Sequence, residues 1–162
     1  MKYRMPAEWE PHEATWLTWP RNKITWPGAL LKRVEEIYIQ MMRGLLPGEK
    51  VNLLVPDEKT AKSVVRRLEA KNIPSKNLIF HKVKTVDVWI RDYGPIFVKR
   101  IMDDRSWIVD SSTIHHPPST IQLAFTKWIF NSWGGKYSDL ARDTRVVDKI
   151  EYFKNFYLEQ NK

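Results

Sequence analysis

No cysteine occurs among the 162 residues of this sequence. A chain without thiols forms neither a disulfide nor a thiolate metal site, and it has no cysteine to act as a nucleophile. Long apolar runs are also missing. None approaches the roughly 20 residues that a helix needs to cross a bilayer, and no apolar segment follows the N-terminus as in a signal peptide. We therefore expect a cytoplasmic protein that does not contact a membrane.

The composition indicates one globular domain, because 43% of the residues are hydrophobic and 12% are aromatic, with eight tryptophans. The net charge of +8 is concentrated in residues 59–100, which contain eleven Lys and Arg against three acidic residues. These cations can cover the solvated face of a helix, or they can attract a polyanion such as nucleic acid. No recognised RNA or DNA motif is present, which favours the solvated face.

Hydrophobic periodicity predicts strands that alternate with helices. Asp57 is expected to cap one of these helices, since its carboxylate can accept hydrogen bonds from free amide groups of the first turn. Strands are predicted at 14–19, 51–55, 78–83, 85–90 and 95–99, and helices at 28–43, 57–71 and 144–160. Alternation of this kind indicates the α/β class.

The segment 86–95, Val-Asp-Val-Trp-Ile-Arg-Asp-Tyr-Gly-Pro, holds the residues best suited to binding or catalysis. In an extended strand Asp87, Trp89 and Arg91 would share one face, and Asp92 would lie at the strand end, where α/β proteins place reactive groups. A carboxylate beside an indole suits a planar cation, which can pair with the oxygens and stack on the ring. The alternative is structural, with Arg91 paired to a carboxylate and Trp89 in the core.

The pattern Asp87-x-Trp89-x-Arg91-Asp92-x-Gly94-Pro95 resembles the signature of the agmatine deiminases and the related bacterial peptidylarginine deiminases. Residues 5–20 resemble the opening of that family, and residues 130–137 resemble a later motif. The resemblance implies a five-bladed α/β propeller of ββαβ modules. About two modules would be present, at roughly 14–98 and 99–160, so that 1–162 is a single incomplete domain from the N-terminal half.

The resemblance also implies the reaction, hydrolysis of a guanidinium group of agmatine, arginine or peptidyl-arginine to a ureido product and ammonia. In the family a cysteine attacks the guanidinium carbon, a His-x-Asp element moves protons and two carboxylates hold the cation. Asp92 matches a catalytic carboxylate, and the matching substrate-binding positions are Trp89, Arg91, Asp87, Trp16 and Trp19. No cofactor is implied. The adjacent His115 and His116 lack further ligands nearby, so we expect no metal site.

The family's cysteine, its His-x-Asp element and its Glu-Gly-Gly segment have no counterpart in this sequence. We therefore expect a truncated deiminase that is inactive alone. A non-catalytic guanidinium-binding module is the main alternative, and a basic nucleic-acid-binding protein is the other. An incomplete propeller would expose apolar surface and strand edges, so we expect contact with a separate C-terminal half or with another copy.

Overall fold

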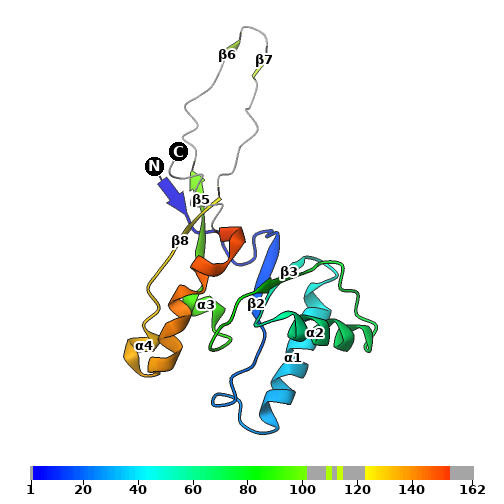
Figure 1. Cartoon of the computed structure of the whole chain (residues 1–162). Coiled ribbons are helices and arrows are strands. Elements are labelled where there is room, and N and C mark those ends of the chain that lie inside the picture. The colour runs from blue at the N-terminus through cyan, green and yellow to red at the C-terminus, as the bar shows by residue number, and fades with distance from the viewer. Residues whose placement is uncertain (1, 102–108, 111–112, 115–122, 154–162) are drawn as a thin grey trace. The chain divides into compact units, whose positions relative to one another are not determined.

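The computed structural model describes residues 2–101, 109–110, 113–114 and 123–153 (Figure 1). The chain divides into two compact units. Unit 1 comprises Met1–Glu10 and Pro95–Lys127, and unit 2 comprises Pro11–Gly94 and Trp128–Lys162. Each unit is described separately, and the six predicted site residues all belong to unit 2.

Unit 2 contains a parallel sheet in the order β2-β3-β4. Its strands are β2 (Ala14–Thr18), β3 (Lys50–Val55) and β4 (Leu78–Lys82), each within about a residue of its predicted position. Ala14 pairs with Lys50 and Val51 pairs with Leu78. The central strand β3 is buried along almost its whole length, as expected for a parallel strand with neighbours on both sides.

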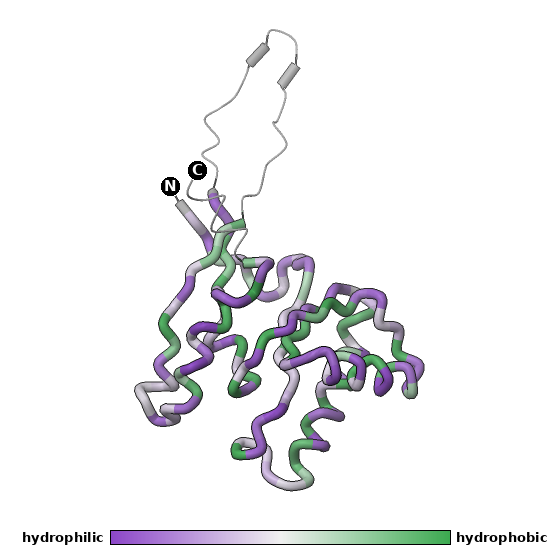
Figure 2. Tube along the Cα trace, in the orientation of Figure 1, coloured by the Kyte–Doolittle hydropathy of each residue, from purple (hydrophilic) through white to green (hydrophobic). Residues whose placement is uncertain are grey.

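Two helices connect these strands, α1 (Leu30–Leu45) and α2 (Glu58–Glu69). Both alternate between polar and apolar residues (Figure 2), and their apolar sides join one core with the strands. Because parallel crossovers are right-handed and the strand order runs in one direction, both helices cover the same face of the sheet. That core contains Leu17, Ile39, Met42, Val51, Leu53, Val55, Ala61, Val64 and Leu68.

The start of α2 confirms the predicted cap. Asp57 has an extended backbone, and its carboxylate accepts hydrogen bonds from the backbone N–H and the hydroxyl of Thr60, at 2.7 and 2.8 Å. These bonds satisfy a free amide of the first turn and hold the pKa of Asp57 below its usual value, the backbone bond making the larger contribution.

The predicted strand at 85–90 is wrong. After β4 the chain bends through residues 86–88 and forms a short helix, α3 (Ile90–Tyr93). Strand alternation therefore does not apply here, and Asp87 and Trp89 differ sharply, with 1% and 37% of their surface exposed. The expectation that Asp92 lies at the end of a strand is also wrong, because Asp92 lies in the helix α3.

The C-terminal part of unit 2 also differs from the prediction. Two short elements, α4 (Ser132–Gly135) and the 3₁₀ helix η1 (Ser138–Arg145), precede or reach residue 144. The helix predicted at 144–160 is then replaced at its start by the end of η1 and by a second 3₁₀ helix, η2 (Val147–Lys149). Helical backbone resumes at 151–153, and the rest of the predicted helix lies outside the described residues. The buried residues of this segment include Leu140, Val146, Val147, Ile150 and Phe153.

Unit 1 is built on an antiparallel sheet in the order β1-β5-β8, formed by β1 (Lys2–Arg4), β5 (Ile96–Ile101) and β8 (Leu123–Thr126). The predicted strand at 95–99 corresponds to β5. Glu10 accepts hydrogen bonds from Arg4 and Lys99, and these contacts hold its pKa well below the usual value, Arg4 contributing most. A separate pair, β6 (Val109–Asp110) and β7 (Thr113–Ile114), is antiparallel, and His115 and His116 lie outside the described residues.

The structure thus confirms a mixed α/β fold. Among the described residues no helix is long and apolar enough to span a bilayer.

Candidate functional site

The segment 86–94 is a closely hydrogen-bonded loop that ends in α3. Within it, Ile90 N–H donates to the Val88 carbonyl at 2.7 Å, and Asp92 N–H donates to the Trp89 carbonyl at 3.0 Å. Gly94 N–H donates to the Ile90 carbonyl at 2.7 Å. A Cβ on Gly94 would lie 2.3 Å from that same carbonyl oxygen, so only glycine permits this close approach.

Asp87 is a buried structural carboxylate within this loop. Its Oδ1 accepts a hydrogen bond from Val88 N–H at 2.8 Å, and its Oδ2 accepts from the Asn22 amide at 3.2 Å and from the Thr25 hydroxyl. Both oxygens are therefore occupied by groups of unit 2. The carboxylate joins the loop after β2 to the loop after β4.

Asp143 of η1 holds the same loop from the other side. Its two carboxylate oxygens accept hydrogen bonds from Val86 N–H at 2.7 Å and Asp87 N–H at 2.9 Å. The side chain is only 2% exposed. Burial raises its pKa, and the nearby Asp87 carboxylate adds to the rise, whereas the two amide bonds oppose it.

Tyr93 completes this buried network. Its hydroxyl lies 2.7 Å from the Thr18 hydroxyl and 3.1 Å from the Asp87 carbonyl oxygen, to which it donates. The residue is 1% exposed, and burial raises its pKa far above the usual value for tyrosine. Thr18 ends strand β2, so the contact ties α3 to the sheet.

Trp89, Arg91 and Asp92 are the exposed side chains of this segment. Trp89 immediately precedes α3, and Asp92 is the third residue of this helix. Within the part of the chain that the structure describes, no hydrogen bond or ion pair engages the Asp92 carboxylate. A carboxylate and an indole are thus both accessible to a ligand.

The Trp89 ring contacts Trp133, which lies on a turn of unusual conformation. Ser132, Trp133, Gly134 and Gly135 have φ of 56°, 55°, 78° and 82°, which makes one left-handed helical turn. It is closed by Gly135 N–H donating to the Asn131 carbonyl at 2.8 Å. The ring centroids of Trp89 and Trp133 are 5.8 Å apart at 83°. Left-handed backbone is costly for non-glycine residues and concentrates at functional sites.

The other two predicted tryptophans lie elsewhere in unit 2. The half-buried Trp16 stacks on His81 at 4.7 Å and contacts Phe153 at 4.7 Å. Trp19 is 5% exposed and packs edge-on against Tyr38 of α1, with the Arg67 guanidinium 5.4 Å from its ring. Among the described residues neither ring contacts Trp89, so the structure does not bring all six residues together.

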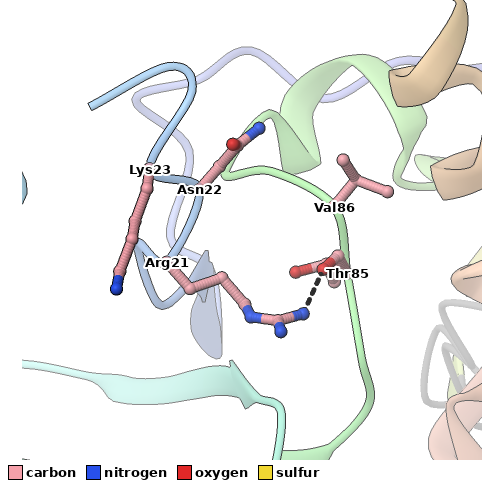
Figure 3. A pocket seen from close by; sticks show the side chains of 5 residues that line it. All are labelled: Arg21, Asn22, Lys23, Thr85 and Val86. Atoms are coloured by element: carbon pink, nitrogen blue, oxygen red, sulfur yellow. Dashed lines mark hydrogen bonds between the residues drawn. The ribbon is translucent and has the colours of Figure 1, made fainter. Parts of the chain in front are cut away.

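A basic hollow of about 290 Å³ lies beside the buried end of this loop (Figure 3). It is lined by residues that follow β2 and residues that follow β4, and Arg21 donates a hydrogen bond to the Thr85 carbonyl at 2.8 Å across it. None of the six predicted site residues lines it. The lining residues are Arg21, Asn22, Lys23, Thr85 and Val86.

No group of three or more His, Asp or Glu side chains suited to a metal ion occurs among the described residues. The accessible side chains of the segment include a carboxylate and an indole, two groups of the kinds that pair with and stack on a planar cation.

Comparison with known proteins identifies the family of this chain. Residues 4–161 match the sequence pattern of the Porphyromonas-type peptidyl-arginine deiminases, and the chain belongs to this family. It is 28% identical over 152 residues to an agmatine deiminase from Stutzerimonas stutzeri, covering 91% of this chain and 34% of that protein. The chain spans about a third of the length of the curated relatives it matches.

Two solved structures are similar in fold and sequence. Agmatine deiminase of Enterococcus faecalis is 25% identical with a TM-score of 0.62, over 89% of this chain and 33% of that one. A variant of agmatine deiminase from C. jejuni with substrate bound is 25% identical with a TM-score of 0.61, over 94% of this chain and 38% of that one.

The sequence interpretation did not identify Asp143 or Tyr93 as parts of the loop's support. Tyr93 lies inside the recognised motif, so its proximity to the site could be expected. Asp143 has no such signal, because it lies 56 residues from Asp87 between Arg142 and Thr144 and looks like a surface residue.

Proposed function

We propose that this chain is the guanidinium-holding part of an agmatine deiminase. The complete reaction would convert a guanidinium group and water to a ureido group and an ammonium ion. Asp92 would pair with the guanidinium N–H groups and Trp89 would stack on its plane. Agmatine is the substrate we propose because the Stutzerimonas, Enterococcus and C. jejuni relatives are named agmatine deiminases, although the family pattern itself is named for peptidyl-arginine.

One observation carries the proposal: in a chain whose residues 4–161 match the deiminase family, the motif loop has one buried, fully engaged carboxylate and one accessible carboxylate. Asp87 is occupied by internal hydrogen bonds, so it supports the loop. Asp92 and Trp89 are accessible, which supports their proposed role as the groups that meet the ligand. Arg91, also exposed, would bind at the edge of the site, and Trp16 and Trp19 would act from the opening segment.

The remaining catalytic groups would come from outside these 162 residues, which contain no cysteine. We also propose that the mixed α/β fold is part of a five-bladed propeller with modules at 14–98 and 99–160. A separate C-terminal half would be the partner that completes the site.

Isothermal titration of the chain with agmatine tests the binding step. Asp92→Asn should weaken binding at least about tenfold, because a charge-assisted pair contributes about 1.5–3 kcal/mol. Asp139→Asn is the matched control, since Asp139 is an exposed aspartate whose one ion pair within the described residues is with the nearby Arg142 in η1. Equal affinity for wild type and Asp92→Asn would overturn the assignment.

A non-catalytic guanidinium-binding module remains the second candidate, favoured by the same exposed carboxylate in a chain without a thiol. The two candidates differ once the rest of a deiminase is supplied. If a C-terminal half carrying the family's cysteine and His-x-Asp element restores ammonia release from agmatine, the deiminase proposal holds. If the mixture binds agmatine without release, the chain is a binding module.

A further inference from the structure

We propose that Asp143 is a positioning residue that sets the place of Trp89 and Asp92 by gripping the start of the loop that carries them. The inference rests on the proposed function for its meaning in substrate binding. The two hydrogen bonds from Val86 N–H and Asp87 N–H to the Asp143 carboxylate lie within unit 2, and their effect on the loop can be measured separately.

Asp143 acts on backbone, which makes its effect independent of any one side chain of the loop. Each of its oxygens takes one amide N–H, from Val86 at 2.7 Å and from Asp87 at 2.9 Å. Two bonds from one planar carboxylate to adjacent amides fix the orientation of the peptide unit between them. The carboxylate of Asp143, in η1, therefore helps to set the direction in which the chain enters the segment.

Burying this carboxylate costs free energy, which argues for a specific role. Asp143 is 2% exposed and lies close enough to Asp87 for the two charges to repel. Within the described ranges no ion pair compensates it, and Lys149 makes the smallest of the contributions to its pKa. Hydrophobic residues would fill such a position at lower cost. Only an acceptor with two oxygens, however, would satisfy both amides.

The effect can pass directly from Asp143 to the exposed side chains. After Asp87, the Val88 N–H is held by the Asp87 carboxylate, and the Ile90 N–H is held by the Val88 carbonyl. Asp92 N–H and Tyr93 N–H then bond to the Trp89 carbonyl, at 3.0 and 3.2 Å. Hydrogen bonds therefore follow one another along the backbone from the two Asp143 contacts to Trp89 and Asp92, so we expect loss of those contacts to loosen the loop although Asp87 and Tyr93 still anchor it.

Asp143→Asn is the critical variant, because an amide keeps the shape but has one acceptor and places its NH₂ against a second N–H. Asp143→Glu restores both acceptors on a longer side chain. Val64→Ala is the matched control, since Val64 is a fully buried residue of α2 in the helix-covered core and its loss lowers stability without touching the loop. Each chain is measured by titration with agmatine and by backbone amide hydrogen exchange.

In Asp143→Asn we expect faster exchange at Val86, Asp87, Asp92 and Tyr93, unchanged exchange in β3, and agmatine binding weaker by roughly tenfold or more. Asp143→Glu should recover part of both effects, and Val64→Ala should keep its affinity within about twofold.

Uniform exchange changes across unit 2 in Asp143→Asn, or affinity equal to that of Val64→Ala, would overturn the inference and leave a general stabilising role. If wild type binds no agmatine, the proposed function fails. The exchange pattern of Asp143→Asn then still decides whether the loop is positioned by Asp143.

Discussion

At the scale of single residues, unit 2 contains two kinds of carboxylate that look alike in sequence. Asp87 and Asp143 are buried and engaged with backbone or neighbouring side chains, and Asp92 is exposed. A buried carboxylate is stable only if its hydrogen bonds are satisfied, so these two are committed to structure. The exposed one keeps both oxygens available for a guanidinium.

Tyr93→Phe tests how firmly this loop is tied to the sheet. Removing the hydroxyl leaves the buried Thr18 hydroxyl and the Asp87 carbonyl without this partner, so the free energy of unfolding should fall by about 1–2 kcal/mol. Urea denaturation measures the change. Tyr137→Phe, at a tyrosine that is 49% exposed, should change stability by less than about 0.5 kcal/mol. Equal losses in the two variants would argue against the network.

His81 gives the fold a dependence on pH. Burial lowers its pKa below the ordinary value of 6.5, and its Nε2 lies 2.8 Å from the amide oxygen of the buried Asn52. The unfolded chain therefore takes up a proton at a higher pH than the folded chain does. The stability that neutral His81 contributes is present above pH 6.5 and is lost as pH falls through its folded-state pKa.

The unfolding free energy should decrease as pH falls below about 6.5, by less than about 1.4 kcal/mol per pH unit for this one proton. His81→Gln keeps an N–H donor for Asn52 but does not titrate, so part of the decrease should disappear. Denaturation curves of both chains at several pH values between about 5 and 8 measure it. Parallel pH profiles for the two chains would rule out this role for His81.

At the scale of elements, helix α2 behaves as its sequence predicts. Ala61, Val64 and Leu68 are buried against the sheet, and Lys59, Lys62 and Arg66 are exposed on the other side. The basic residues therefore form a solvated helix face, one of the two explanations that the charge pattern left open. Arg67 is the exception, since it pairs with Glu35 of α1 at 2.6 Å.

The double variant Lys62→Gln and Arg66→Gln should change the free energy of unfolding by only a few tenths of a kcal/mol, because surface substitutions away from specific contacts have small effects. Agmatine affinity should stay unchanged, since neither residue belongs to the motif loop. Chemical denaturation and titration of the double variant provide the measurement. Loss of agmatine binding in this variant would show that the site had been assigned to the wrong part of unit 2.

Regular elements with local signals were predictable, and the loop was not. The strands β2, β3 and β4 and the helices α1 and α2 follow from periodicity and from the Asp57 cap, which depend on neighbouring residues. The 85–90 segment has a strand-like pattern, but its amides bond to the Asp143 carboxylate and not to another strand. A contact between residues 56 positions apart leaves no local signal.

The candidate site, like the fold, was predictable only in part. The resemblance identified the segment that carries Trp89 and Asp92, because a motif records which residues occur together. Their exposure, the burial of Asp87 and the left-handed turn at Trp133 depend on tertiary packing. Two adjacent glycines after Trp133 were consistent with a turn, but the positive φ of Ser132 and Trp133 was not predictable from residue type, since such residues rarely adopt it.

At the scale of the whole molecule, the proposed function separates binding from catalysis. Unit 2 carries the accessible carboxylate and indole, and the 162 residues include no cysteine. They cover about a third of the length of the related deiminases. Holding a guanidinium needs charge and a stacking surface, whereas displacing ammonia from it needs a nucleophile and a proton carrier.

The 162-residue chain should therefore release no ammonia from agmatine above the rate of a protein-free blank, even at concentrations where titration shows binding. A serine or threonine could replace a thiolate only if a base activated it. Ser132 directly precedes Trp133, whose ring contacts Trp89. The buried Ser132 hydroxyl has no hydrogen-bond partner in the described part of the chain. An enzyme-coupled ammonia assay over several hours measures the rate. Ammonia that rises in proportion to chain concentration, and that disappears in Asp92→Asn, would show that these residues contain a nucleophile of their own.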